Sequence, residues 1–299
     1  MRALAVDASA PERIALREVD PPQPGRDEVL VQVRALSLNR GEVNRIPMAG
    51  DGWRPGWDIA GVLPDGTRVV AVLNGGAWAE QVAVPRNQLA PLPDAVSFAQ
   101  AAALPVAGLT ALRVLRFAPR GLLGSRVLIT GAAGGVGRFA IQLGRRGGAH
   151  ITAIVGSEER AAGLRELGAD EVVIGHEKVA GRYDLILESA GGASLAHLMT
   201  CVDPDGTLVM FGNSANQPTT FNVRDVYLGG YVRLQGFTFF HGWPADPPAR
   251  DLAYLVVLVA EGALDPQVAG EMPWEEMPRA IAELRERQVP GKLILTIQG

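Results

Sequence analysis

One stretch near the middle of the chain constrains the fold more than any other. Residues 127–131 read Val-Leu-Ile-Thr-Gly, a short apolar run typical of a buried parallel strand, and a helical pattern begins after residues 132–137. This is an A-x-G-x-x-G dinucleotide fingerprint in which Ala132 replaces the first glycine. Gly134 lets the backbone approach a pyrophosphate, Gly137 lets the helix pack close to the strand, and the helix N-terminus faces the phosphates. The alternative is an ordinary glycine-rich turn, and the flanking strand–helix spacing argues against it.

Strands and helices alternate from this fingerprint onward, over the segment from about residue 126 to residue 240. Helices are expected between most of the strands, for example at 158–167 and 194–201. The expected strands are 127–130, 151–155, 171–174, 184–188, 207–211 and 232–237. This alternation predicts an α/β fold with a doubly wound parallel sheet.

The residues before and after this region have a different pattern. Residues 1–106 are mainly short strands joined by Gly/Pro turns, including a hairpin turn at Pro64-Asp65-Gly66, and predict a small β-barrel. A loop at 241–248 precedes two helices and a terminal strand at 292–297, which is expected to return to the first domain. The predicted domains are therefore 1–106 with 241–299, and 107–240.

Composition excludes several functional classes. The 299 residues are 47% apolar and carry a net charge of −4, so nothing favours a nucleic-acid or membrane partner. The single cysteine, Cys201, excludes an internal disulfide framework and a Cys-rich zinc site. The N-terminus lacks a signal-peptide pattern and no apolar run is long enough to span a bilayer, so a cytoplasmic protein is expected.

Several motifs in family order resemble the zinc-independent quinone oxidoreductase and enoyl reductase branch of the medium-chain dehydrogenases. They are Ser37-Leu38-Asn39, residues 75–80, residues 101–111, residues 131–137, Leu167-Gly168-Ala169-Asp170 and Pro290-Gly291-Lys292-Leu293. The resemblance implies a GroES-like β-barrel domain and a Rossmann domain. The chain departs from it in the compact segment 41–66, where Asn44 stands at a position often held by tyrosine.

The resemblance also implies that no zinc is bound. Val106 stands where a ligand cysteine would fall, and Gly56-Trp57-Asp58 replaces the family's Gly-His-Glu. The four histidines have no metal-ligand spacing. We therefore expect no metal.

The second expected strand, 151–155, indicates the cofactor. No carboxylate follows it to bind a ribose 2′-hydroxyl, because Gly156 stands at its tip. Ser157 can donate to a 2′-phosphate and Arg160 can clamp it, which favours NADP(H) and matches the pattern of the family's NADPH enzymes. The alternative is that Ser157 caps a helix whose first turn carries solvated charges. His176 is a weak candidate for a further contact.

By resemblance, Asn39 lies near the nicotinamide ribose and the substrate, and is the one catalytic candidate. The other implied cofactor contacts are Thr110, Ala132, Ala133, Gly134, Gly135, Val136, Gly156, Ser157, Arg160, Phe211, Asn213, Phe237 and Phe239. Asn39 could instead only stabilise a turn, and the phenylalanines could be plain core. Arg40, Glu42 and Asn44 are the polar residues expected near the mouth of the substrate pocket, where a general acid would lie. Each fits a solvated surface residue equally well, so no general acid is assigned.

These residues predict an NADPH-dependent, zinc-independent oxidoreductase that transfers hydride to a quinone or an α,β-unsaturated carbonyl. One alternative is an enoyl-thioester reductase of fatty acid or polyketide metabolism. Another is a non-catalytic NADP(H)-binding sensor or partner protein. The resemblance also implies a homodimer, formed through edge strands near 232–237.

Overall fold

The computed structural model describes residues 1–243 and 245–298; Pro244, within the expected loop at 241–248, and Gly299 lie outside the described residues. The chain divides into two compact units, Met1–Leu109 with Gly242–Gly299, and Thr110–His241. The divisions fall within three residues of the sequence-based boundaries. The assignment of the units to substrate and cofactor stays a prediction. No helix in the described residues is long and apolar enough to cross a membrane.

The second unit is built on a parallel sheet of six strands in the order β10-β9-β8-β11-β12-β13. Its strands are β8 (Arg126–Ile129), β9 (His150–Val155), β10 (Glu171–Ile174), β11 (Tyr183–Glu188), β12 (Val202–Met210) and β13 (Arg233–Gly236). All five neighbouring pairs are parallel. The predicted doubly wound sheet is confirmed: each strand overlaps its expected range, and β12 begins five residues earlier than the expected 207–211.

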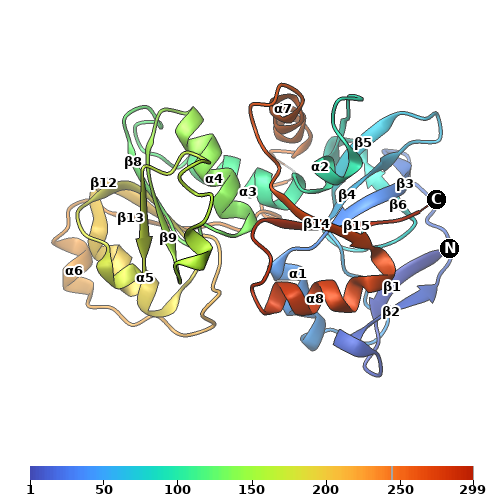
Figure 1. Cartoon of the computed structure of the whole chain (residues 1–299), viewed down its shortest axis with the longest axis horizontal. Coiled ribbons are helices and arrows are strands. Elements are labelled where there is room, and N and C mark those ends of the chain that lie inside the picture. Colours follow the sequence, from blue (N-terminus) through green and yellow to red (C-terminus); the bar gives the residue numbers. More distant parts are fainter. Residues whose placement is uncertain (244, 299) are drawn as a thin grey trace. The chain divides into compact units, whose positions relative to one another are not determined.

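The helices of this unit are α4 (Gly135–Arg146), α5 (Gly192–Leu198) and α6 (Val223–Tyr227), and Figure 1 shows α4 and α5 beside the strands. The helix expected at 158–167 is wrong. A three-residue 3-10 turn at Glu159–Ala161 is followed by irregular turns, because Ala162 has a non-helical ψ of 131° and Gly163 has φ of +75°. A left-handed glycine ends helical hydrogen bonding at that point.

The first unit contains a seven-stranded sheet and a separate two-stranded one. Its strands are β1 (Arg2–Val6), β2 (Ile14–Glu18), β3 (Glu28–Ser37), β4 (Asp58–Val62), β5 (Arg68–Val72), β6 (Gln81–Pro85), β7 (Leu89–Pro91), β14 (Val268–Pro273) and β15 (Lys292–Thr296). The long strand β3 changes partner along its length. Its first half pairs with β6, and its second half pairs with β4 on one side and β15 on the other. Such a strand shared by several partners gives the sheet its barrel-like character.

The chain end returns to the first unit as predicted. β15 pairs antiparallel with β3, so Ile294 faces Ser37, and β14 adds on the other side of β15. The unit's helices are α1 (Arg40–Arg45), α2 (Phe98–Ala102), α7 (Ala249–Ala260) and α8 (Met277–Arg285), while α3 (Pro105–Leu115) crosses the division. In Figure 1, α8 lies beside α1, so two segments far apart in the sequence are neighbours in this unit.

Candidate functional site

The cofactor residues predicted after strands of the second unit gather at one edge of its sheet. The glycine loop follows β8, residues 156–160 follow β9, residues 211–213 follow β12 and residues 237–239 follow β13. Because all six strands are parallel, their carboxyl ends share one edge. The strand order reverses beside β8, so the glycine loop lies at the topological switch point, where doubly wound proteins bind their ligands.

The glycine loop has the close geometry that an anion cradle requires. Gly134 precedes α4 with φ of −82°, and a Cβ there would approach only the carbonyl oxygen of Gly131, at 3.3 Å. A Cβ at Gly137 would lie 2.6 Å from both Cα and O of Ala132, so the helix packs directly on the loop. Ala132 and Ala133 are buried, while Gly135 and Val136 are half-buried. The first N–H groups of α4 have no intrahelical acceptor and suit a phosphate.

A buried carboxylate shapes the neighbouring loop, and the sequence analysis missed it. Glu188 ends β11 and is fully buried. Its carboxylate accepts the N–H groups of Ala190 at 3.0 Å and Gly191 at 2.9 Å, and the hydroxyl of Ser194 at 3.0 Å. An acid between an apolar strand and a glycine pair was the available signal. Glu188 fixes the loop beside the glycine cradle without reaching solvent.

The residues expected to bind a 2′-phosphate, which follow β9, lie beside an acidic side chain. Gly156 is exposed, and Ser157 and Arg160 are half-buried. The alternative that Ser157 caps a helix is wrong, because Glu158 is the N-cap of the short 3-10 turn and no side chain caps it. The Ser157 hydroxyl instead donates to Glu159 and lowers the pKa of that carboxyl. Ser157 and Arg160 therefore stand within one turn of an exposed acid.

The remaining candidates of this unit are held by packing. The N–H of Phe211 donates to Glu188 O at 2.9 Å and that of Phe237 to Met210 O at 2.8 Å, so both amide donors are already used. The Phe237 ring stacks edge-on against Phe117 at 6.3 Å. The Arg113 guanidinium lies 5.5 Å from the ring of the buried Phe239. Thr110 is buried on α3 and Asn213 is exposed.

Asn39, in the first unit, belongs to a cluster that the sequence analysis did not foresee. Lys292 Nζ donates to Leu38 O at 3.0 Å, Asn39 Oδ1 at 2.8 Å and Asp58 Oδ2 at 3.2 Å. Asn39 Nδ2 donates to Asp58 Oδ2 at 2.7 Å and to Glu42 Oε1 at 3.2 Å. The half-buried Asn39 is thus tied to three buried ionisable side chains.

Glu42 is fully buried, so its description as a solvated surface residue was wrong. Its Oε1 accepts the N–H of Asn39 at 2.6 Å, as in a helix capping box, which places it on the inner side of α1. Its Oε2 is buried and has no hydrogen-bond partner among the described residues. Burial, and secondly the charge of Asp58, raise the pKa of Glu42 well above its usual range.

Val106 and the segment 56–58 lie in the same region. The sequence resemblance equates these positions with zinc-binding residues of the zinc-dependent dehydrogenases. Val106 contributes only its N–H, which donates to Asp58 Oδ1 at 3.0 Å. Within residues 1–243 and 245–298, no group of three or more His, Cys, Asp and Glu side chains could hold a metal. The donor set near Asp58 therefore does not fit a zinc ion, since the buried Lys292 ammonium already faces this carboxylate.

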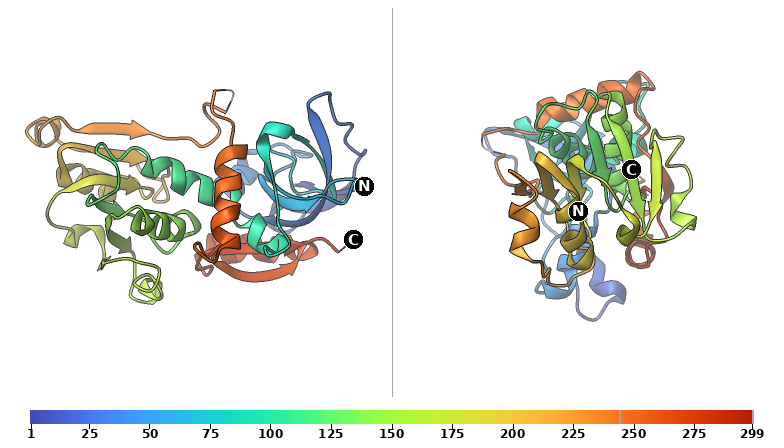
Figure 2. Two further views of the ribbon diagram at one scale, coloured as in Figure 1. Left: turned by 90° about the horizontal axis from the view of Figure 1, so that it is seen from above. Right: turned by 90° about the vertical axis from the view of Figure 1, so that its left-hand side faces the viewer.

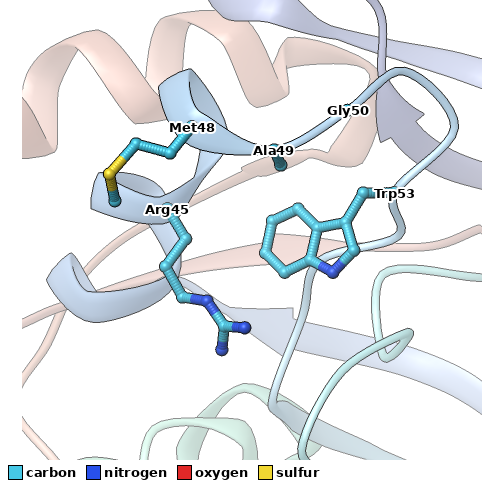
Figure 3. Close-up of a pocket in the computed structure, with 5 residues that line it drawn as sticks. All are labelled: Arg45, Met48, Ala49, Gly50 and Trp53. Atoms are coloured by element: carbon cyan, nitrogen blue, oxygen red, sulfur yellow. The ribbon is translucent and has the colours of Figure 1, made fainter.

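The compact segment 41–66 forms a shallow pocket (Figure 3). Its wall includes Trp53, with the Arg45 guanidinium 5.2 Å from the ring centroid, and the side chain of Met48, which is 82% exposed. Its volume of about 260 Å³ lies below the ~300–1,000 Å³ of typical small-molecule sites. By itself this pocket is too small to enclose a drug-sized ligand.

Comparison with known proteins assigns the family. A model described as zinc-binding dehydrogenase matches residues 135–253. A quinone oxidoreductase of Pseudomonas aeruginosa is 31% identical, over 95% of this chain and 96% of its own length. The chain belongs to the quinone oxidoreductase branch of the medium-chain dehydrogenase/reductase superfamily. This branch consists of oxidoreductases, which sets the coarse class of the protein.

Two solved structures of the branch show the same fold over the full length. A quinone oxidoreductase of Pseudomonas syringae has a TM-score of 0.86 at 27% identity and covers 99% of both chains. The quinone oxidoreductase of Escherichia coli, solved with NADPH, has a TM-score of 0.87 at 23% identity and covers 99% of this chain and 100% of its own. The two units are therefore the GroES-like and Rossmann folds that the motifs implied.

Proposed function

We propose that this chain is an NADPH-dependent, zinc-independent oxidoreductase that transfers hydride to a quinone or an α,β-unsaturated carbonyl. The observation that carries the proposal is the pairing of two features at one sheet edge. A glycine cradle stands at the switch point, and Ser157 and Arg160 follow the next strand where no carboxylate ends it. The family assignment and the NADPH in the Escherichia coli relative support the same cofactor.

The chain's own residues would bind and orient the cofactor. The loop 132–136 and the N-terminus of α4 would hold the pyrophosphate. Arg160 would hold the 2′-phosphate together with Ser157, whose hydroxyl would turn from Glu159 to the phosphate. The carbonyl groups of Phe211 and Phe237 remain available for the carboxamide, since their N–H groups are used. When bound, NADPH supplies hydride at C4 of its nicotinamide. A quinone or enone takes its proton from solvent or a nearby hydroxyl, so no dedicated acid is required.

Zinc independence rests on the donor set. A catalytic zinc site takes three nitrogen, sulfur or carboxylate ligands and an open position. Here Val106 has no ligand atom in its side chain, and Asp58 is already neutralised by Lys292 at 3.2 Å. A metal at this carboxylate would face the ammonium directly. Quinones and α,β-unsaturated carbonyls can accept hydride without a metal, whereas alcohol oxidation by a zinc enzyme proceeds through a metal-bound alkoxide.

Turnover tests the reaction. NADPH oxidation is followed at 340 nm against a panel of quinones and enones, with calorimetric binding of NADPH and NADH alongside. Turnover with a quinone or enone supports the proposal. Activity confined to an activated enoyl thioester would point to the reductase of fatty acid or polyketide metabolism. Tight NADPH binding without turnover on any acceptor would leave the non-catalytic role.

Arg160→Ala tests the cofactor preference. A charge-assisted contact is worth about 1.5–3 kcal/mol, so the NADPH dissociation constant should rise about 10- to 100-fold. The dissociation constant for NADH, which lacks the 2′-phosphate, should stay unchanged. Arg165→Ala is the matched control, because Arg165 donates to Asp170 O in the same segment and is exposed. An equal loss for both cofactors in Arg160→Ala would refute the phosphate clamp.

We further propose a homodimer that pairs β13 of two copies. β13 ends the six-stranded sheet, all four of its residues are exposed, and Figure 2 (left) shows it at the margin of the unit. Exposed apolar side chains gather around it at Phe221, Val223, Tyr227, Leu228, Tyr231 and Leu234. An unpaired edge strand with apolar neighbours pairs readily with its own copy across a two-fold axis.

Leu234→Glu should convert this dimer to a monomer. A charge at the centre of the strand would be buried against its copy, which is strongly unfavourable. Light scattering at micromolar concentration should then give the monomer mass of 31.6 kDa, half the value for the unmodified chain. Leu123→Glu, at a leucine 86% exposed elsewhere in the unit, should leave the dimer intact. A monomeric unmodified chain would overturn the proposal.

A further inference from the structure

The orientation of the Asn39 side chain is determined by Lys292. An ammonium only donates hydrogen bonds, so the Asn39 atom 2.8 Å from Nζ is the amide oxygen. Both hydrogens of Nδ2 are directed to carboxylates, on Asp58 and on Glu42. The amide therefore has no donor left for a ligand. What it can offer is its oxygen, as an acceptor for a hydroxyl group.

The charges around Asn39 do not balance without a proton. Lys292 is 3% exposed, and Glu42 and Asp58 are both fully buried. One ammonium cannot neutralise two carboxylates, and an uncompensated buried charge is costly. Asp58 accepts four hydrogen bonds, from Ser37, Asn39, Val106 and Lys292, as a carboxylate does. Glu42 has an oxygen without a partner among the described residues, so it is the better site for the proton.

Other charged groups near α1 are engaged elsewhere. Arg40 donates to Leu284 O at 3.0 Å, and Arg45 lies over Trp53. The charged residues of α8, which packs against α1, are Arg279, Glu283 and Arg285, and each is paired at the surface, with Glu276, with Arg279 and with Glu12 respectively. Asp58 and Lys292 are thus the charges that act on Glu42, apart from the Asn39 hydrogen bonds.

We propose that Glu42 and Lys292 are positioning residues for Asn39, in a buried neutral cluster with Asp58 in which Glu42 holds one proton. Lys292 selects the direction of the amide and Glu42 holds its N–H side, so the Asn39 oxygen is presented as a fixed acceptor. One part of this inference rests on the proposed function, namely that the Asn39 oxygen faces the nicotinamide end of a bound cofactor. The protonation and the fixed amide belong to the protein alone.

Glu42→Gln tests the proton. Glutamine is nearly isosteric with a protonated glutamate and does not titrate. The folded protein retains a proton that the unfolded chain releases above about pH 4.5, so the stability of the unmodified chain should fall as pH rises through and beyond that value, and level off above the folded pKa. Glu42→Gln has no such proton to release, so its stability should not fall in this way. The Tm of Glu42→Gln relative to that of the unmodified chain should therefore rise by several degrees between about pH 5 and pH 8.

Glu261→Gln is the matched control, since it removes one exposed carboxylate of the same unit. It should keep the same Tm–pH profile as the unmodified chain. Parallel profiles for the unmodified chain and Glu42→Gln would overturn the proposed proton on Glu42.

The fixed orientation of the Asn39 amide is tested by NMR, with a variant at position 42 that cannot accept its hydrogen bond. The Asn39 side chain should give two separate, slowly exchanging N–H signals in the unmodified chain and in Glu42→Gln. In Glu42→Leu, which loses the acceptor, exchange should be faster. If the protein turns over a quinone, kcat of Glu42→Gln should stay within about twofold from about pH 6 to 9, while kcat of Glu42→Leu falls about tenfold or more.

The two proposals fail in different ways. Slow amide exchange without turnover on any acceptor would refute the proposed reaction and leave the cluster standing. Turnover with a freely exchanging Asn39 amide, or an unchanged kcat in Glu42→Leu, would refute the positioning role and leave the reaction standing.

Discussion

Lys292→Met should lose about 3–5 kcal/mol of unfolding free energy, the usual effect of removing one member of a buried ion pair. The loss arises because the fully buried carboxyl group of Asp58 is left without the ammonium that lies 3.2 Å from it. The same change removes one donor from each of three acceptors, on Leu38, Asn39 and Asp58. Chemical denaturation at neutral pH measures the effect as a lower midpoint at unchanged slope.

The double variant Asp58→Asn with Lys292→Met separates charge from packing. It removes both ions, so it should recover a large part of the stability lost in Lys292→Met. Lys178→Met, at an exposed lysine of the other unit, controls for the loss of a positive charge and should change stability by less than about 0.5 kcal/mol. A loss below about 1 kcal/mol in Lys292→Met would mean that the buried pair contributes little.

Two glycines of the fingerprint should separate folding from cofactor binding. In Gly137→Ala the new Cβ would lie 2.6 Å from backbone atoms of Ala132 and Gly131, which cannot move without shifting α4 from the loop. The variant should lose about 1–3 kcal/mol of stability and bind NADPH at least about tenfold more weakly. Thermal unfolding and calorimetry report the two effects.

Gly134→Ala should give the opposite combination. Its φ of −82° suits alanine, and the nearest atom, the carbonyl oxygen of Gly131 at 3.3 Å, need shift by only a few tenths of an ångström, so stability should fall by no more than about 1 kcal/mol. The methyl group occupies the space through which a pyrophosphate would approach, so NADPH affinity should fall about tenfold or more. If Gly134→Ala binds NADPH normally, the phosphates do not lie at this loop.

The sequence predicts the second unit well because its signals are local. Each apolar run at 127–130, 151–155 and 184–188 is bounded by polar or glycine residues, and each forms a strand. The helix expected at 158–167 fails because Gly163 adopts φ of +75°, which a pattern of apolar residues does not reveal. β14 was missed because its six residues include a glycine and a proline, which are poor strand signals.

The cluster around Asn39 could not be predicted in the same way. Asp58 and Lys292 lie 234 residues apart, and they meet because β4 and β15 both pair with the end of β3 at Ser37. Glu42 follows Asn39 on a six-residue helix, and six residues are too few for periodicity to show which side faces inward. Long-range packing, which decides whether a charged side chain is buried, leaves no local signature in the chain.

The position of Lys292 also has a consequence for synthesis on the ribosome. Strand β15, which begins at this lysine, can join β3 only after residues 292–296 have been made, more than 250 residues after β3 itself. Until then the nascent first unit holds two acidic side chains without their cation and a sheet edge without its partner. A chain broken off before residue 292 would keep the glycine loop but lack the ammonium that bonds the amide oxygen of Asn39. Translation through β15 is thereby a condition for assembling the Asn39 cluster, and chains that stop before it should expose the open edge of β3 to quality control.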